Sequence, residues 1–336
     1  MSGLHSGGGA RARDLGIVFE GESGELGALT DVPGVAVGYC TLIEGDGAHA
    51  VRSGVTAILP RGRDGVGMPC AAAVHSFNGN GELTGRSWID ESGALSMPIG
   101  ITGSHAVGAV HTGIDAWVAR TSPQTAVQWM LPVVGETWDG YLHDINGGHV
   151  APEHAVMALE AATSGPLAEG SVGGGTGMNC YGFKGGTGTA SRVVGYGTDS
   201  YTVGVLIQAN FGSREELRLS GWPLGARSAV PNPLQDDAWL DRERAAALRV
   251  PGGAGSAIVV IATDAPLLPG QCAALARRGA LGLGRSGTTG SHFSGDIMLA
   301  FSTANERALT SSFRRAARAS NTRTSDSSRG GGSTRC

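Results

Sequence analysis

The chain has 336 residues, 41% hydrophobic and 16% charged, which is enough for one large domain or two ordinary ones with a sizeable core. The formal net charge of −4 argues against a general nucleic-acid binder, and no apolar run is long enough to span a membrane. Glycine accounts for 57 residues without a G-X-Y period, so the chain is not a collagen, and we expect tight turns between its apolar runs.

The N-terminal residues 1–25 are rich in Gly, Ser, Arg and Glu, and we expect them to form a flexible arm. They lack the apolar stretch of a signal peptide. The five cysteines are scattered without a CxxC pair, which indicates neither a zinc ribbon nor a disulfide framework. We therefore expect a cytoplasmic protein in a reducing compartment.

Residues 26–306 carry the apolar runs, and we expect them to form a single domain. Short runs bounded by Gly or Pro predict strands at residues 35–43, 55–59, 71–77, 127–134 and 297–301. Two near-continuous apolar runs, at residues 203–209 and 257–263, predict strands buried on both faces. Helical spacing or an opening Pro predicts helices at residues 106–120, 152–162 and 269–283.

Three segments interrupt this pattern. Residues 170–188 read as a glycine-rich loop region, and residues 213–251 as a polar, proline-containing linker that ends abruptly at an apolar strand. Residues 307–336 contain seven Arg and one Asp, and almost no apolar side chain from residue 311 onward. Such a segment buries too little surface to offset its ordering entropy, so we expect a disordered tail.

The junction between the linker and the next strand is the most informative part of the chain. Gly255 and Ser256 stand immediately before the apolar run at residues 257–263. Self-cleaving N-terminal nucleophile hydrolases need this layout: a hydroxyl attacks the carbonyl of a small preceding residue, and the freed residue then serves as the nucleophile. A plain loop-to-strand turn has the same local pattern, so the interpretation depends on partners elsewhere.

Three further motifs supply such partners. Ser294 and Asp296 enter an apolar strand, where they could form a relay with the nucleophile or an ordinary turn. Asn210 ends a buried strand, where its amide could stabilise an oxyanion or simply form a turn. Glu136 and Trp138 follow another apolar run; they could bind a substrate ammonium and wall a pocket, or lie in a surface turn.

Six motifs occur in order along the chain: Thr30-Asp31-Val32-Pro33-Gly34-Val35, Phe77-Asn78-Gly79-Asn80-Gly81-Glu82, Gly135-Glu136-Thr137-Trp138-Asp139-Gly140, Gln208-Ala209-Asn210-Phe211-Gly212, Gly255-Ser256 and Ser294-Gly295-Asp296-Ile297. Together they closely resemble the DmpA/BapA family of self-processing aminopeptidases (peptidase family S58). That family includes L-aminopeptidase/D-Ala-esterase/amidases and β-aminopeptidases. The resemblance covers most of the chain, from residue 26 to residue 305.

The resemblance implies an α/β fold, a four-layer αββα sandwich like that of the N-terminal nucleophile hydrolases and the ornithine acetyltransferases. It implies self-cleavage between Gly255 and Ser256 into a large and a small chain that stay associated. Ser256 is then the nucleophile, Ser294 and Asp296 complete its network, and Asn210 contributes to the oxyanion hole. No metal or organic cofactor is implied, and a homo-oligomer, a tetramer or larger, is expected.

The resemblance also implies a substrate site. Glu136 holds the free amino group of a short peptide, aminoacyl amide or ester, and Trp138, Asn78 and Asn80 are the other expected substrate-binding residues. Some members carry Tyr near the position of Trp138, whose indole N–H could donate to the oxyanion hole or only shape the pocket. Some carry Glu in place of Asp296, which changes reach but not charge. Members normally continue with folded chain where residues 307–336 form the Arg-rich tail.

Particular residues disfavour other functions. Ornithine acetyltransferases use Thr as the nucleophile, whereas this chain has Ser256. The glycine run at residues 173–177 lacks the Gly-Lys-Ser/Thr of a P-loop nucleotide site. The nine His contain no HExxH spacing, and no G-x-S-x-G elbow is present, which disfavours a metallopeptidase and an ordinary α/β-hydrolase. The main alternative is an uncleaved, inactive relative that acts as a binding or assembly protein.

Overall fold

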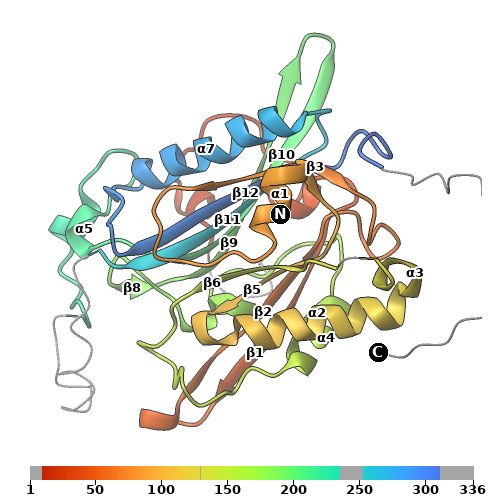
Figure 1. The fold of residues 1–336 in the computed structure, drawn as a ribbon. Helices are drawn as coiled ribbons and strands as arrows, with labels where there is room; N and C mark the ends of the chain where they lie inside the picture. The colour runs from red at the N-terminus through yellow and green to blue at the C-terminus, as the bar shows by residue number, and fades with distance from the viewer. Residues whose placement is uncertain (1–9, 129, 235–252, 311–336) are drawn as a thin grey trace, which may run out of the picture.

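The computed structural model describes residues 10–128, 130–234 and 253–310, and these form two stacked β-sheets between two layers of helices (Figure 1). The smaller sheet has the order β1-β2-β5-β6 and consists of β1 (Ala36–Glu44), β2 (Val51–Leu59), β5 (Ile99–Gly103) and β6 (Val133–Thr137). The larger sheet has the order β4-β3-β12-β11-β10-β9 and consists of β4 (Ala94–Leu95), β3 (Cys70–Ser76), β12 (Ser294–Ser302), β11 (Gly255–Thr263), β10 (Asp199–Asn210) and β9 (Gly186–Tyr196).

Helices cover the outer face of each sheet (Figure 1). The smaller sheet packs against α2 (Val107–Thr121) and α4 (Pro152–Glu160), and the larger sheet packs against α7 (Pro269–Arg285). The shorter elements are α1 (Arg86–Ser92), α3 (Pro123–Ala126), α5 (Leu224–Arg227), β7 (Asn179–Cys180), β8 (Phe183–Lys184), and the 3₁₀ turns η1 (Ala12–Leu15), η2 (Leu29–Asp31), η3 (Gly47–His49), η4 (Ser104–Ala106), η5 (Gly173–Gly177) and η6 (Arg214–Glu216). The layer order helix–sheet–sheet–helix confirms the expected αββα sandwich.

Three apolar clusters fill the spaces between the four layers. The cluster between the two sheets contains Ile58, Ile101, Leu206, Val260 and Phe301. The other two clusters lie beneath α2 and α4 and beneath α7. Side chains of β11 and β12 alternate between the inter-sheet cluster and the cluster under α7, so both strands are buried on both faces. This explains why the two runs are almost continuously apolar.

Most strands and helices expected from the sequence are present with similar bounds, but the strand expected at residues 127–134 lies instead at Val133–Thr137, and several elements were missed. The strand β5 was not predicted, and the segment expected to be a glycine-rich loop at residues 170–188 contains η5, β7, β8 and the start of β9. β9 begins with Gly-Thr-Gly-Thr and its last three residues are exposed, so it lacks the apolar pattern on which the prediction relied. Its partner β10 holds it in the sheet over eleven residue pairs.

The first part of the expected linker is folded, which corrects that prediction for residues 213–234. Arg214 is buried and donates from Nε to the Tyr181 carbonyl and from Nη1 to the Val230 carbonyl, both at 2.9 Å. Its guanidinium lies 3.5 Å from the ring centroid of Phe183. The sequence alone could not show that Arg214 is buried against carbonyl groups and an aromatic ring, because a solvent-exposed Arg has the same sequence pattern. The rest of the linker, residues 235–252, lies outside the described residues.

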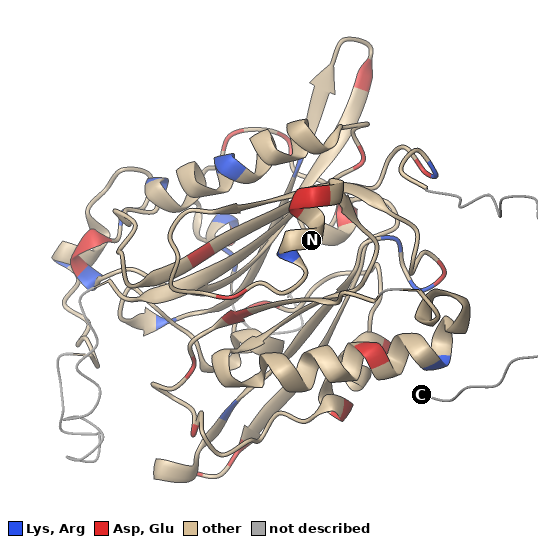
Figure 2. Ribbon diagram, viewed as in Figure 1, with Lys and Arg blue, Asp and Glu red and all other residues tan. Residues whose placement is uncertain are grey.

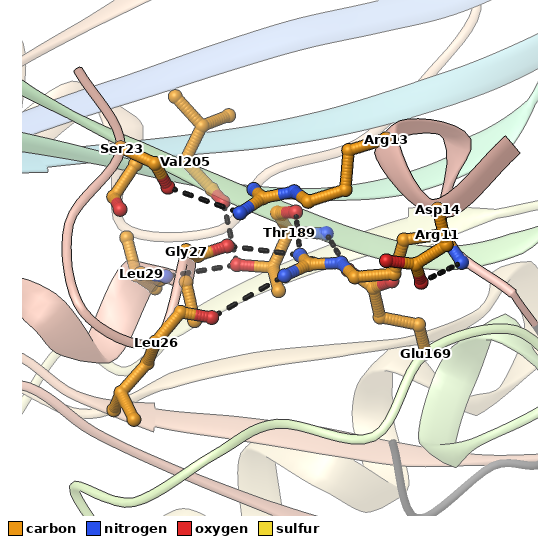
Figure 3. A network of polar contacts seen from close by, with 12 residues as sticks. Arg11, Arg13, Asp14, Ser23, Leu26, Gly27, Leu29, Glu169, Thr189 and Val205 are labelled. Atoms are coloured by element: carbon orange, nitrogen blue, oxygen red, sulfur yellow. Dashed lines mark hydrogen bonds and ion pairs between the residues drawn. The ribbon is translucent and has the colours of Figure 1, made fainter. Parts of the chain in front are cut away.

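Residues 10–25 lie along β9 and make specific contacts there (Figure 3). The Arg11 guanidinium, 9% exposed, donates to Glu169 Oε1 at 2.7 Å, to the Gly27 carbonyl at 2.9 Å and to the Thr189 carbonyl at 2.6 Å. Further along, the Val193 amide donates to the Glu22 carbonyl at 2.9 Å. Flexibility of the arm stays a prediction; residues 1–9 and the expected tail from residue 311 lie outside the described residues.

None of the helices in the described part of the chain has the length and hydropathy needed to span a bilayer.

The contacts of Arg11 give a test of this attachment. We expect Arg11→Ala to lower the free energy of unfolding by about 2 kcal/mol or more, because it leaves Glu169 and the carbonyls of Leu26, Gly27 and Thr189 without this charged donor. Urea unfolding followed by circular dichroism measures this change. Arg13→Ala is the matched control, since among the described residues the Arg13 side chain donates only to Ser23 Oγ, at 3.3 Å. Equal unfolding midpoints for the two variants would show that the Arg11 contacts add no stability.

Candidate active site

Buried acidic side chains mark one region of the molecule. Among the described residues, the buried carboxylates are Glu136, Asp139 and Asp296, which are 7%, 1% and 0% exposed. Figure 2 shows that charged residues otherwise lie mainly on helices and loops, with few in the strands. Burying a carboxylate costs free energy unless it is hydrogen-bonded, so such a group has a specific role in structure or chemistry.

The three central strands of the larger sheet bring the predicted catalytic residues of β10 and β11 together. Asn210, at the end of β10, pairs with Ser256, at the start of β11, and Ser256 pairs in turn with Gly295 of β12. Paired residues point to the same face of a sheet. Ser256 and Asn210 therefore both face the smaller sheet, where Glu136 lies in β6.

The loop that follows β6 connects directly to Ser256. The main-chain amide of Trp138 donates to Ser256 Oγ at 3.1 Å, and Asn210 Nδ2 donates to the Trp138 carbonyl at 2.8 Å. Asn210 Oδ1 accepts from the Asn179 amide at 2.8 Å, which fixes the orientation of the Asn210 side chain. A buried hydroxyl is thus held beside an oriented amide, as acyl transfer requires.

Glu136 is oriented by two donors. Its Oε1 accepts from the Glu82 amide at 2.9 Å, and its Oε2 accepts from Ser104 Oγ. Burial raises the pKa of Glu136, while these two hydrogen bonds oppose the rise. Gly135 beside it has no side chain, so β6 approaches Ile258 of the larger sheet closely; an added Cβ would lie 3.1 Å from that side chain. Gly135 faces the larger sheet, so the Glu136 side chain points to the other face of β6, where Ser104 and the Glu82 amide hold its carboxylate.

Ser294 and Asp296 form a buried pair on the neighbouring strand. Ser294 Oγ donates to Asp296 Oδ1 at 2.7 Å, and burial raises the pKa of Asp296. Both residues are one position away from Gly295, which pairs with Ser256, so their side chains point to the opposite face of the sheet. Among the described residues the Ser256 and Ser294 hydroxyls are not hydrogen-bonded to each other. A side-chain relay between them stays a prediction.

Asn78 and Asn80 belong to a loop that lies against β12. Asn78 Nδ2 donates to Asp296 Oδ2 at 2.8 Å, and Asn78 Oδ1 accepts from the Asp296 amide at 2.5 Å, so both ends of this side chain support Asp296. Asn80 is exposed and donates from Nδ2 to the Phe293 carbonyl at 2.9 Å. The substrate-binding roles expected for these two residues stay predictions.

The Trp138 indole lies over Gly140, where an added Cβ would be 2.6 Å from the ring atom Cζ2. The contact with Ser256 Oγ comes from the Trp138 main chain and not from the indole, a distinction that the sequence could not make. Sequence reasoning also missed the partners Ser104, Asn179 and Ser53, of which Ser53 Oγ donates to Asp139 Oδ2 at 2.7 Å. These residues stand outside the recognisable motifs, and only the folded chain brings them to the site.

Gly255 occupies a position where any side chain would collide with the backbone of β10. An added Cβ would lie 2.0 Å from the Asn210 carbonyl oxygen and 3.0 Å from Phe211 Cα. The strand β11 begins at this residue, so the Gly255–Ser256 bond is part of the sheet. Packing against β10 thus calls for a small residue directly before Ser256.

Comparisons with known sequences agree with this site. The profile of peptidase family S58 matches residues 27–328. A beta-peptidyl aminopeptidase BapA of Sphingosinicella microcystinivorans is 51% identical over 310 residues, which cover 91% of this chain and 77% of the relative. Another, of Sphingosinicella xenopeptidilytica, is 46% identical over 306 residues, which cover 88% of this chain and 74% of the relative.

Solved structures show the same architecture. The L-aminopeptidase D-Ala-esterase/amidase of Ochrobactrum anthropi, described as a prototype for the serine aminopeptidases and a variant of the Ntn hydrolase fold, has a TM-score of 0.80 at 46% identity, with 88% of this chain and 79% of that chain covered. A β-aminopeptidase of Burkholderia sp. has a TM-score of 0.80 at 45% identity, with 94% and 84% covered. The expected relation to the N-terminal nucleophile hydrolases is confirmed.

The packing at Gly255 is testable without any assay of activity. We expect Gly255→Ala to lower the free energy of unfolding by about 1–3 kcal/mol or to prevent folding, because the methyl group collides with the backbone of β10. Thermal and urea unfolding of the purified variant measure this change. Gly108→Ala is the control, since an added Cβ there meets no atom within 4 Å. Wild-type stability of Gly255→Ala would contradict the packing argument.

Proposed function

Because this chain belongs to peptidase family S58, we propose that it is a self-processing serine aminopeptidase that releases N-terminal residues from short peptides, amides or esters. The observation that carries the proposal is the arrangement at the start of β11: Ser256 follows an obligatory Gly255, is buried, and lies beside Asn210 and the Trp138 amide. The relatives named as aminopeptidases support the same chemistry.

Self-cleavage begins at the Gly255–Ser256 bond. Ser256 Oγ attacks the Gly255 carbonyl carbon, its proton passes to the Ser256 nitrogen, and the peptide bond becomes an ester. Water then hydrolyses the ester, which frees the Gly255 carboxylate, the Ser256 hydroxyl and a new amine on Ser256. The same oxygen is then available for substrate, and the amine is placed to accept its proton.

Turnover repeats this acyl transfer on a substrate. Ser256 Oγ attacks the first carbonyl of the substrate, and its proton passes through the Ser256 amine to the leaving nitrogen or oxygen. Asn210 Nδ2 and neighbouring amides stabilise the oxyanion. Water hydrolyses the acyl-enzyme and releases the amino acid. In this scheme Ser294 and Asp296 support the charge balance at the start of β11 from the other face of the sheet.

Glu136 accounts for the preference for a free N-terminus. Its carboxylate is buried, fixed by Ser104 and the Glu82 amide, and has no Lys or Arg partner among the described residues. A substrate ammonium supplies that partner, which places the first carbonyl at Ser256. An acetyltransferase of related fold is disfavoured by the serine nucleophile, and an inactive binding protein is the outcome if no cleavage occurs. As in the sequence-based expectation, a homo-oligomer is part of the proposal.

Ser256→Ala tests both reactions at once. We expect the variant to remain a single 34.0 kDa chain, because one oxygen performs self-cleavage and turnover. The wild type should give fragments of roughly 26 and 8 kDa, in proportion to the residues on each side of the cleaved bond. Intact mass and N-terminal sequencing measure this, and the small fragment should begin Ser-Ala-Ile-Val. An uncut wild-type chain that hydrolyses no aminoacyl amide would favour the binding-protein alternative.

Glu136→Gln tests the recognition of the ammonium. We expect kcat/KM for an aminoacyl amide to fall by about 10- to 100-fold, mainly through KM, because a charge-assisted contact becomes a neutral one. Steady-state kinetics on self-cleaved protein measure it. Glu82→Gln is the control: Glu82 is exposed, and its main-chain amide, which contacts Glu136, is retained. If the two variants behave alike, Glu136 does not bind the ammonium.

A further inference from the structure

Asp139 directly follows Trp138, and its carboxyl group lies in a space made by two glycines. An added Cβ at Gly103 would lie 2.2 Å from Asp139 Oδ2, and one at Gly177 would lie 2.8 Å from Asp139 Cβ. Asp139 is 1% exposed. The end of β5 and the turn η5 thus both lack side chains where this carboxyl group is accommodated.

The two oxygens of Asp139 differ in their surroundings. Oδ2 accepts from Ser53 Oγ of β2 at 2.7 Å, whereas Oδ1 is buried with no hydrogen-bond partner among the described residues. An unsatisfied buried oxygen is unfavourable for stability. A residue that only stabilised the fold would gain from a neutral side chain here, so this carboxylate indicates another role.

Ser53 and its neighbour attach the loop after β6 to β2 at two points. Besides the Ser53–Asp139 contact, the Arg52 amide donates to Nδ1 of the buried His143 at 3.2 Å. The Asp139 carbonyl accepts from the Leu142 and His143 amides, both at 3.1 Å, so residues 139–143 form one compact turn. The turn therefore cannot move independently of β2.

The residue just before this turn is the one that contacts the nucleophile. The Trp138 amide donates to Ser256 Oγ and the Trp138 carbonyl accepts from Asn210 Nδ2. A small displacement of the turn would change both contacts, and misplacement by about 1 Å costs on the order of 10²-fold in rate. The position of the Trp138 main chain thus depends on how Asp139 is held.

We propose that the Ser53–Asp139 pair positions the main chain of Trp138 for the reactions of Ser256, with Asp139 acting as a positioning residue that touches no substrate. The inference rests on the proposed function, since it concerns the same nucleophile. It assigns a role to the Asp of the Gly135–Gly140 motif and to Ser53, which lies in a different sheet from Ser256.

This role predicts a particular pH dependence. Burial raises the pKa of Asp139 from an ordinary 3.8 to about 6, opposed by the hydrogen bond from Ser53 and by the charge of His105. The titratable groups near it are Glu136 in β6, the exposed His105 after β5, and His143 in the same turn. Below about pH 6 the carboxylate is protonated and its contact with Ser53 weakens, so activity should fall.

Stability should change in the opposite direction over the same interval. A pKa that is higher in the folded than in the unfolded chain means that the folded protein binds the proton more tightly. The contribution of Asp139 to stability is then largest below its unfolded pKa of 3.8 and is lost as the pH rises through about 6. If activity rises with pH while stability falls, Asp139 has a positioning role and not only a structural one.

The test uses the full chain with Asp139→Asn and Ser53→Ala, and Asp144→Asn as the control in the same loop, where Asp144 contacts His149 at 3.1 Å. Self-cleavage is followed on gels, and kcat and KM are measured on an aminoacyl p-nitroanilide, from pH 4.5 to 8 (on the order of two units either side of the midpoint). We expect Asp139→Asn to lower the self-cleavage rate and kcat by about 10-fold or more with KM little changed. The acid limb near pH 6 should disappear.

Ser53→Ala gives an independent result, because it removes a hydrogen bond that lowers the pKa of Asp139. We expect its acid limb to move to higher pH, whereas Asp144→Asn should keep the wild-type profile. Melting curves show whether each variant is folded. An unchanged profile in folded Asp139→Asn and Ser53→Ala overturns the inference alone. A wild type that neither cleaves itself nor hydrolyses the substrate overturns the proposed function and the inference together.

Discussion

The hydrogen bond from the Trp138 amide to Ser256 Oγ joins the two sheets at the site. Trp138 follows β6 of the smaller sheet, and Ser256 begins β11 of the larger one, so the contact forms only when the sheets pack at the correct distance. The apolar cluster between the sheets sets that distance, and the missing side chain of Gly135 lets β6 approach Ile258. The reactive geometry is therefore a property of the assembled sandwich and not of a preformed loop.

The site is also unbalanced in charge. Glu136, Asp139 and Asp296 receive hydrogen bonds from hydroxyl, amide and main-chain donors, and within the described residues none of them forms an ion pair with Lys or Arg. Neutral donors satisfy the geometry of a carboxylate without cancelling its charge, and burial raises all three pKa values. Under the proposed function, the ammonium group of the substrate supplies a counter-charge for Glu136.

The family resemblance carried by the ordered motifs implied the layer architecture, and the apolar runs predicted most of the long strands and helices, because motifs and apolar runs are local signals. It did not predict β5, the folding of residues 213–234 around Arg214, or the strand character of β9, because these depend on partners distant in the chain. It also could not show that Asn78 supports Asp296, or that Ser294 points away from Ser256, since both facts follow from the strand register. The motifs identify the candidate reactive side chains, and the strand register determines which of them lie close together.

The placement of residues 10–25 has a consequence for solubility. β9 is the last strand of the larger sheet, and its outward backbone groups are satisfied by Arg11 at the Thr189 carbonyl, by Glu169 at the Thr189 amide and by Glu22 at the Val193 amide. An unsatisfied strand of this length is a template on which a second chain can add by backbone pairing. The N-terminal segment therefore protects the folded chain against aggregation through this edge, and shortening it to residue 26 would open a path to intermolecular sheets.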